Sequence, residues 1–177
     1  MNLLCLSGSL RAASSSRAVL DHICSHLPEG VAASRFDIGS LPHYNADLGA
    51  PEVVEALKAA IDAADGLVIV TPEYNYSVPG VLKNAIDWAS RPAYASVFKD
   101  KPVLVASTSG GALGGVRAQA HLKYMLNGML ARVFPWQEVI VPQANQKVKD
   151  SVFSDAATEA FIGQAIAAFV DSIGAGL

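Results

Sequence analysis

Short apolar segments alternate with helical patterns along the whole chain, and this alternation constrains the fold more than any other feature. Predicted strands lie at residues 3–7, 32–38, 66–70, 102–107 and 138–141. Apolar spacing and start signals indicate helices at residues 16–27, 53–61, 77–88, 116–130 and 161–170. Strands that alternate with helices form a parallel sheet covered on both faces. The chain is therefore predicted to be a doubly wound α/β protein with strand order 2-1-3-4-5.

Composition narrows the class of protein and its surroundings. The 177 residues are 51% hydrophobic and 16% charged, which is typical of one globular domain, expected to span residues 1–177. A net charge of −3 without a basic run argues against nucleic acid or an anionic membrane as the main partner. No apolar stretch approaches the roughly 20 residues of a membrane span, and no leader precedes the first strand. We expect a cytoplasmic protein.

The cysteines and histidines do not form a pattern that indicates chemistry. Cys5 lies inside an apolar strand and Cys24 on a helix, without CxxC spacing, so neither is interpreted as a redox centre. His22 and His26 are four residues apart on a helix, but no third metal ligand is evident nearby. No metal site and no hydrolytic triad is predicted.

The loop after the first strand has the composition of a phosphate site. Residues 7–17 read Ser-Gly-Ser-Leu-Arg-Ala-Ala-Ser-Ser-Ser-Arg and lead into the first predicted helix. The free N–H groups and the dipole of a helix N-terminus favour an anion. Serine hydroxyls add donors, and Arg11 adds a guanidinium suited to phosphate. A predicted phosphate site at this turn indicates a nucleotide-like cofactor.

Two further loops follow the third and fourth strands, at the same edge of the sheet. Residues 71–80 combine two prolines with Tyr74, Asn75 and Tyr76, and so offer a flat apolar surface with polar rims. Residues 107–115 are rich in glycine, which allows a backbone to approach a ligand closely. From composition alone, a rigid surface turn and a flexible loop remain alternatives for these two segments.

Taken together, the three loops resemble the NADPH-dependent FMN reductase family, a flavodoxin-like group that includes quinone, azo-dye and chromate reductases. The motifs are GSLRxxS at residues 8–14, PEYNYSVPGxLKNAIDW at residues 72–88 and STSGGxxGGxR at residues 107–117. The similarity covers nearly the whole chain, in order and spacing. It implies a flavodoxin-like sandwich with a five-stranded parallel sheet.

The resemblance also implies which residues bind FMN. The phosphate would contact Ser9, Arg11, Ser14 and Ser16. The isoalloxazine and ribityl chain would lie along Pro72, Glu73, Tyr74 and Asn75, and the pyrimidine side would face Ser107, Thr108, Ser109 and Gly110. No side chain is expected to act as a catalytic base or nucleophile, because the flavin carries the chemistry.

The activity implied by the resemblance is that of an FMN-dependent NAD(P)H oxidoreductase. Hydride would pass by a ping-pong route from NADPH or NADH to FMN, and then to a quinone, azo compound, metal oxyanion or free flavin. Family members are homodimers or homotetramers with the flavin at the subunit interface, and Arg91 would contact nicotinamide cofactor phosphate or a neighbouring subunit. The alternatives are a flavodoxin-type electron carrier without its own NAD(P)H oxidation, and a regulatory protein that uses flavin as a redox signal.

Overall fold

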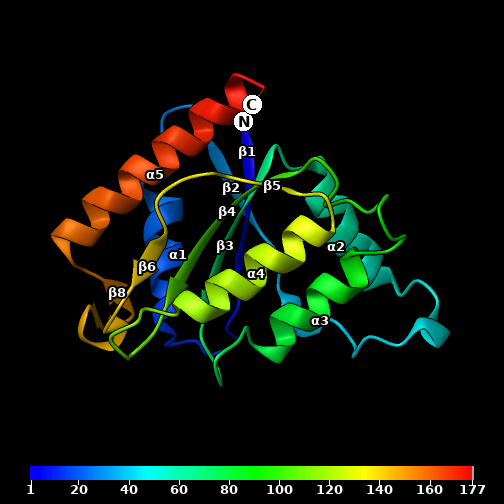
Figure 1. The fold of residues 1–177 in the computed structure, drawn as a ribbon, viewed down its shortest axis with the longest axis horizontal. Coiled ribbons are helices and arrows are strands. Elements are labelled where there is room, and N and C mark those ends of the chain that lie inside the picture. Colours follow the sequence, from blue (N-terminus) through cyan, green and yellow to red (C-terminus); the bar gives the residue numbers. More distant parts are fainter. Residues whose placement is uncertain (177) are drawn as a thin grey trace.

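A six-stranded parallel sheet forms the centre of the protein in the computed structural model, which describes residues 1–176 (Figure 1). Its strands are β1 (Asn2–Ser7), β2 (Ala32–Arg35), β3 (Gly66–Pro72), β4 (Pro102–Thr108), β5 (Arg132–Val133) and β6 (Val139–Val141). The order is β2-β1-β3-β4-β5, and β6 pairs with the carboxyl end of β4, whereas β5 pairs with its amino end. The predicted α/β class and the order 2-1-3-4-5 are confirmed.

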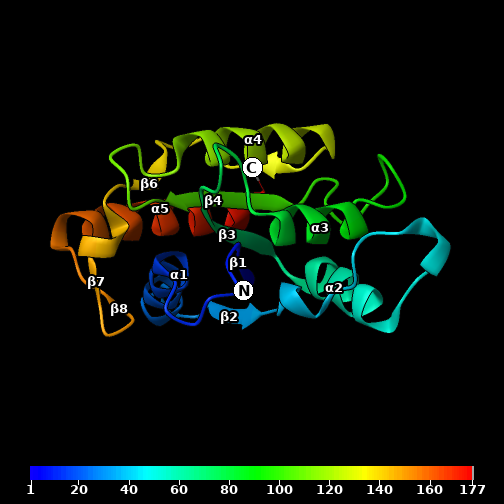
Figure 2. The ribbon, with the colours of Figure 1, turned by 90° about the horizontal axis from the view of Figure 1, so that it is seen from below.

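Five helices cover the two faces of this sheet. They are α1 (Ser15–Ser25), α2 (Glu52–Ala63), α3 (Gly80–Ala89), α4 (Val116–Gly128) and α5 (Ala156–Gly174). Figure 2 shows α1 and α5 on one side of the sheet and α2 and α3 on the other, and the buried residues of α4 pack in the same cluster as those of α2 and α3. Every residue of β3 and β4 is buried, as expected for central strands that helices cover on both faces.

The side-chain alternation of the strands divides the core in two. On β1, Leu4 and Leu6 face the cluster that packs under α2, α3 and α4. Leu3 and Cys5 point to the opposite face and join the cluster under α1 and α5. Successive residues of a strand point to opposite faces, so a strand between two helical layers must be apolar throughout. This is why the strands appear in the sequence as unbroken apolar runs.

The edges of the sheet differ from the sequence-based expectation. The second strand ends at Arg35 rather than at residue 38, because Asp37 caps a 3-10 turn at Ile38–Ser40 by accepting a hydrogen bond from Gly39 N. The strand expected at residues 138–141 is present as β6, and a further two-residue strand, β5, was not expected; the two pair with opposite ends of β4. Pro135 lies between them and cannot donate to a strand ladder.

Several smaller features were not predicted. A hairpin of β7 (Val148–Lys149) and β8 (Val152–Phe153) precedes α5, and 3-10 turns occur at Ala46–Leu48 and Ala144–Gln146. The third predicted helix begins three residues later than expected: α3 begins at Gly80 rather than at residue 77, with Pro79 as its cap residue. Ser77 Oγ instead lies 3.0 Å from His121 Nδ1, and this contact links the loop to α4.

One helix departs from the expectation about membrane-spanning segments. Over the described residues, α5 alone is long and apolar enough, by length and composition, to cross a membrane. A single such helix is weak support for a span, since a core helix of a soluble protein meets the same criterion. Here Ile162, Ala165, Ile166 and Phe169 of α5 are buried in the core beside α1.

Candidate functional site

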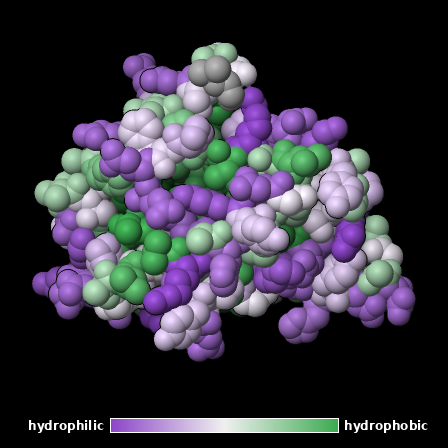
Figure 3. Space-filling view, in the orientation of Figure 1, coloured by the Kyte–Doolittle hydropathy of each residue, from purple (hydrophilic) through white to green (hydrophobic). Residues whose placement is uncertain are grey.

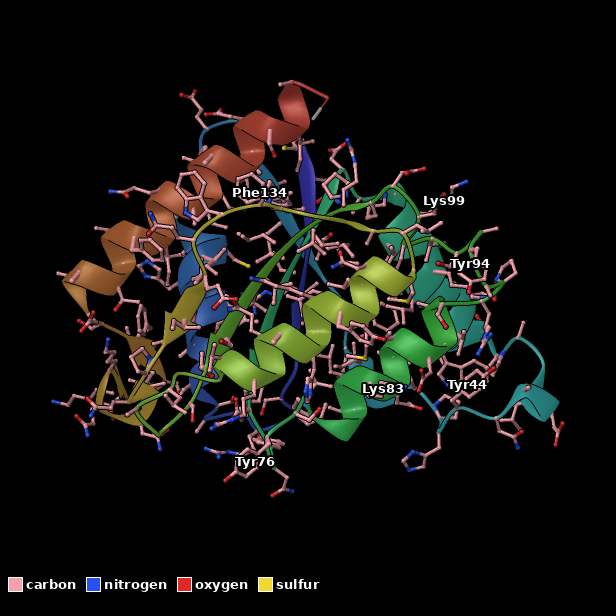
Figure 4. All side chains as sticks on the ribbon, in the orientation of Figure 1. Tyr44, Tyr76, Lys83, Tyr94, Lys99 and Phe134 are labelled. Atoms are coloured by element: carbon pink, nitrogen blue, oxygen red, sulfur yellow. The ribbon has the colours of Figure 1, made fainter. Side chains whose placement is uncertain are left out.

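Three loops that are far apart in the sequence meet at the carboxyl ends of β1, β3 and β4. Figure 4 shows Tyr76, from the loop after β3, at this end, and Figure 1 shows both termini at the opposite end. A hollow of about 140 Å³ opens between the loops. It is lined by Arg11, Ser14, Ser15, Ser16, Pro72, Glu73, Tyr74, Thr108, Ser109, Gly110 and Asn145. Ligands of open α/β sheets bind at such an edge.

The N-terminus of α1 forms one wall of this hollow and lacks a side-chain cap. Ser14 is the N-cap residue, but its hydroxyl lies 2.8 Å from Ser16 Oγ instead of accepting from a backbone amide of the helix. Both hydroxyls are buried. Within residues 1–176 the amides of Ser15 and Ser16 have no acceptor. Unpaired amides and two hydroxyls at a helix N-terminus make a site for a phosphate.

Arg11 provides the positive charge at this end. Its side chain is exposed, and its guanidinium donates a 3.1 Å hydrogen bond to Ala13 O within the same loop. The backbone N–H of Arg11 donates to Ser9 Oγ at 3.3 Å, which fixes the curvature of the loop. The guanidinium thus lies beside the amides of α1 and retains donors for an anion.

The loop after β3 reverses direction in a tight turn. Tyr74 N donates to Ser77 O at 2.9 Å, and Ser77 N donates back to Tyr74 O at 3.0 Å. Asn75 (φ 48°) and Tyr76 (φ 67°) both adopt left-handed conformations, as the central residues of a type I′ turn do. Tyr74 thereby projects across the hollow, and its hydroxyl lies 3.4 Å from Ser9 Oγ on the first loop.

Glu73 joins this turn to the start of α4. One carboxylate oxygen accepts hydrogen bonds from Arg117 N at 3.0 Å and Ala118 N at 3.2 Å, and the other lies 3.4 Å from the Arg117 guanidinium. The Glu73 side chain is only 13% exposed. The guanidinium of Arg117 also lies over the Tyr76 ring, 4.7 Å from its centroid. Glu73 therefore caps α4 and braces the loop.

Glycines let the third loop fold closely around the end of β4. Gly114 (φ 60°) and Gly115 (φ 84°) adopt conformations that side chains rarely tolerate, and a Cβ on Gly115 would lie 3.0 Å from Thr108 O. A Cβ on Gly110 would lie 2.8 Å from Asn145 Nδ2. These contacts keep the backbone of Thr108, Ser109 and Gly110 at the wall of the hollow.

Most of the residues assigned to the flavin site from the sequence line this hollow, but three do not. Ser107 is fully buried and donates a 2.9 Å hydrogen bond to Gly114 O, so it supports the third loop from beneath. Asn75 lies at the tip of the turn, outside the lining of the hollow. Ser9 reaches the hollow only through its contact with Tyr74 and otherwise lines a neighbouring cavity.

One lining residue was missed in the sequence. Asn145 lies in the 3-10 turn after β6, and its side-chain oxygen accepts a 3.1 Å hydrogen bond from Ser15 Oγ. The turn is held in place by Ala144 N, which donates to Ser109 O at 2.8 Å. No motif surrounds Asn145, and 130 residues separate it from Ser15. Only the tertiary structure brings the two together.

The residues present are suited to FMN. The uncapped start of α1 and the Arg11 guanidinium match a phosphate monoester, and the loops at Pro72–Tyr74 and Thr108–Gly110 border the space beside it. Ring-bearing Pro72 and Tyr74 offer apolar walls for a flat heteroaromatic ring. Within residues 1–176 no group of three or more His, Cys, Asp or Glu side chains could hold a metal ion.

Comparison with known proteins gives the same assignment. The family model described as NADPH-dependent FMN reductase matches residues 1–146. An NAD(P)H-dependent FMN reductase of Pseudomonas aeruginosa is 46% identical over 129 residues, which cover 71% of this chain and 69% of the relative. A 2-hydroxy-1,4-benzoquinone reductase of a Burkholderia species is 49% identical over 118 residues, or 66% of this chain and 64% of the relative.

A solved structure extends the similarity over the full fold. The flavoenzyme NAD(P)H:(acceptor) oxidoreductase of Paracoccus denitrificans superposes with a TM-score of 0.89 at 35% identity, covering 98% of this chain and 97% of that one. The expected flavodoxin-like fold, the oxidoreductase class and the cofactors FMN and NAD(P)H are thereby confirmed. The chain belongs to the NADPH-dependent FMN reductase family.

Proposed function

We propose that the protein uses NADPH or NADH to reduce small oxidised molecules, namely quinones, azo compounds, metal oxyanions or free flavin, with FMN held at the three-loop site. The two curated relatives described above are named for the reduction of FMN and of a benzoquinone. The observation that carries the assignment of the site is the uncapped start of α1, because it supplies amides and hydroxyls at one anion position beside a hollow.

The side chains of this site bind and orient rather than exchange protons. Bound FMN would supply hydride acceptance and transfer at its isoalloxazine ring. Ser14, Ser16 and Arg11 would hold its phosphate, and Pro72 and Tyr74 would support the ring. Both carboxylate oxygens of Glu73 are already engaged by α4, so its role is to position the loop.

The visible spectrum of the purified protein tests this proposal. FMN is added, excess flavin is removed, and NADPH is supplied without air. We expect retained yellow absorbance that bleaches with NADPH or NADH and returns when a quinone is added. Bound flavin that neither nucleotide bleaches would indicate an electron carrier instead, and a protein that retains no flavin would refute the site.

We further propose a homodimer or homotetramer that associates through the outer face of α4. Tyr124 on this helix is 82% exposed, and Leu113 and Leu130 beside its ends are also exposed. Figure 3 views this face and shows hydrophobic residues in separate patches among polar ones. Light scattering tests the oligomeric state, and Tyr124→Asp should lower the measured mass. A monomeric wild type would refute it.

The remaining expectations concern the whole chain. We propose that residues 1–177 form one domain, which is supported by a single main sheet whose two core clusters include residues of all five helices. We also propose a cytoplasmic location, and the free thiols of Cys5 and Cys24 are compatible with a reducing compartment. Fractionation of cells that express the tagged protein tests the location.

A further inference from the structure

A second cavity, larger than the three-loop hollow, lies beside it. It measures about 460 Å³ and lies between α1 and the end of edge strand β2. Its lining residues are Cys5, Ser7, Ser9, Leu10, Arg17, Leu20, Arg35, Phe36, Asp37, Ile38 and Gly39. None of them lines the three-loop hollow. Leu10 and Arg17 line this cavity while their sequence neighbours Arg11 and Ser16 line the three-loop hollow, so the two are adjacent.

The cavity contains one available guanidinium, on Arg17, and one partly available carboxylate, on Asp37. The Arg17 side chain is exposed and makes no hydrogen bond or ion pair with any residue that the structure describes. Arg35 forms an ion pair with Asp21, so Arg17 is the cation that remains available. Asp37 uses Oδ1 to accept from Gly39 N at 3.0 Å, whereas no donor among residues 1–176 contacts its Oδ2. A guanidinium recognises phosphate, and a carboxylate oxygen accepts from sugar hydroxyls.

Apolar side chains supply the rest of the lining. Leu10 is 57% exposed, but it packs closely against Gly39: a Cβ added to Gly39 would lie 2.6 Å from a methyl group of Leu10. That close approach requires glycine at position 39 and holds the first loop against the 3-10 turn. Phe36 is half-buried and offers a planar surface in the same cavity. An aromatic base could pack between Leu10 and Phe36.

The place of the cavity in the fold favours a nucleotide. In dinucleotide-binding α/β sheets, an acidic residue at the end of the second strand holds the adenosine ribose, or a nearby arginine accepts its 2′-phosphate. Asp37 and Arg35 lie at the end of the second strand here, and Arg17 faces them from α1. A volume of about 460 Å³ is within the range of small-molecule sites, roughly 300–1,000 Å³.

We propose that this cavity binds a phosphorylated adenosine, with the phosphate at Arg17 and the ribose at Asp37, and that its ligand is the adenosine end of the nicotinamide donor. The second part of this inference rests on the proposed function. Because the neighbouring residues Leu10 and Arg11 line the cavity and the flavin hollow respectively, a dinucleotide crossing Leu10 could reach both. The site would then favour NADPH through its 2′-phosphate.

Arg91, the residue first connected with the nicotinamide cofactor, is placed differently. Its guanidinium lies over the Tyr44 ring, 5.8 Å from the centroid, and it lines neither the cavity nor the flavin hollow. Arg17→Ala and Arg91→Ala therefore separate the two possibilities. Lys99→Ala is a matched control, since Lys99 is exposed and lies far from the three loops in Figure 4.

Calorimetry with adenosine 2′,5′-bisphosphate on the FMN-loaded protein tests the site directly. Loss of a charge-assisted contact should weaken binding at least tenfold in Arg17→Ala, while Arg91→Ala and Lys99→Ala match the wild type. An unchanged FMN affinity in Arg17→Ala would show that α1 is intact. A wild type that does not bind the probe, or equal binding by Arg17→Ala, would overturn the proposal.

Steady-state kinetics test the identity of the ligand. We expect the KM for NADPH to rise about tenfold in Arg17→Ala, with kcat and the KM for the quinone within about twofold of wild type. If calorimetry shows the Arg17 effect but the KM for NADPH is unchanged, the cavity binds a separate nucleotide and its assignment to the donor is wrong. A wild type that binds the probe but never oxidises NADPH would instead refute the proposed function.

Discussion

The hydroxyl of Ser14 shows how a single residue prepares the site. A serine at an N-cap normally accepts a hydrogen bond from the helix, and losing that bond costs about 1 kcal/mol. Ser14 instead pairs with Ser16 and leaves the first amides of α1 open. The first amides of α1 therefore gain hydrogen bonds, and the helix gains stability, only when an anion binds. The same serines that weaken the free helix would strengthen the complex.

Replacement of Arg11 by alanine tests the phosphate position. The guanidinium is exposed and near the start of α1, so Arg11→Ala should weaken FMN binding by about tenfold, as loss of one charge-assisted hydrogen bond does. Titration of flavin fluorescence measures the affinity, with Lys99→Ala as an equal loss of charge elsewhere. Wild-type affinity in Arg11→Ala would contradict the assignment.

Cys24 provides a prediction with a defined pH dependence. A hydrogen bond with the Cys5 thiol lowers the pKa of Cys24 to about 7, and the same pairing together with burial raises the pKa of Cys5. Because the thiolate is the nucleophile, alkylation of Cys24 by iodoacetamide should increase with pH and reach its half-maximum near pH 7.

The midpoint of this pH dependence tests whether Cys24 is paired with Cys5. Cys24→Ser should remove the reaction altogether, since burial shields the Cys5 thiol from the reagent and raises its pKa even without Cys24. A midpoint between about pH 8 and 9, the ordinary range of a free thiol, would contradict the pairing of the two sulfur atoms.

At the scale of elements, α4 depends on a residue outside it. Its own N-cap is Gly115, which has no side chain, and the carboxylate of Glu73 from the loop after β3 takes over that role. A negative charge at a helix N-terminus also interacts favourably with the helix dipole. The helix and the flavin loop are therefore fixed to one another by the same carboxylate.

Glu73→Gln should loosen this connection. Loss of the charge at the cap should lower the free energy of unfolding of the FMN-free protein by about 1 kcal/mol, as measured by urea denaturation. Glu29→Gln is the control, because Glu29 is exposed in the loop before β2, outside any helix, and its side chain makes no hydrogen bond or ion pair with the residues that the structure describes. Equal effects of the two substitutions would argue against the capping role of Glu73.

The elements also show what the sequence could predict. The central strands β3 and β4 were evident because burial on both faces requires unbroken apolar runs. The additional strand β5 was not evident, because a strand of two residues leaves too short a pattern. The positions of Ser107 and Asn145 in the site were not predictable either, since both depend on how the third loop folds against the turn after β6.

For the whole molecule, the site exists only when the sheet is complete. Its lining comes from four separate regions, residues 11–16, 72–74, 108–110 and 145, so no isolated part of the chain presents it. A ligand that binds only the folded state adds RT ln(1 + [L]/Kd) to stability. Flavin binding and global unfolding are consequently coupled.

Thermal denaturation should reveal this coupling. FMN at 100 times its Kd adds about 2.7 kcal/mol, which corresponds to a rise of roughly 5–10 °C in Tm for a chain of this size. Riboflavin, which has no phosphate, should give a clearly smaller rise at the same concentration, because the amides of α1 stay unpaired. Equal rises would show that the phosphate position contributes nothing.

The open amides at the start of α1 have one more consequence. They recognise the charge and oxygen atoms of a phosphate, which inorganic phosphate and sulfate share with FMN. Flavin affinity measured in phosphate buffer should then be weaker than in a buffer of bulky organic ions. In a living cell, the fraction of this protein that carries its cofactor would follow the cell's phosphate nutrition as well as its vitamin supply.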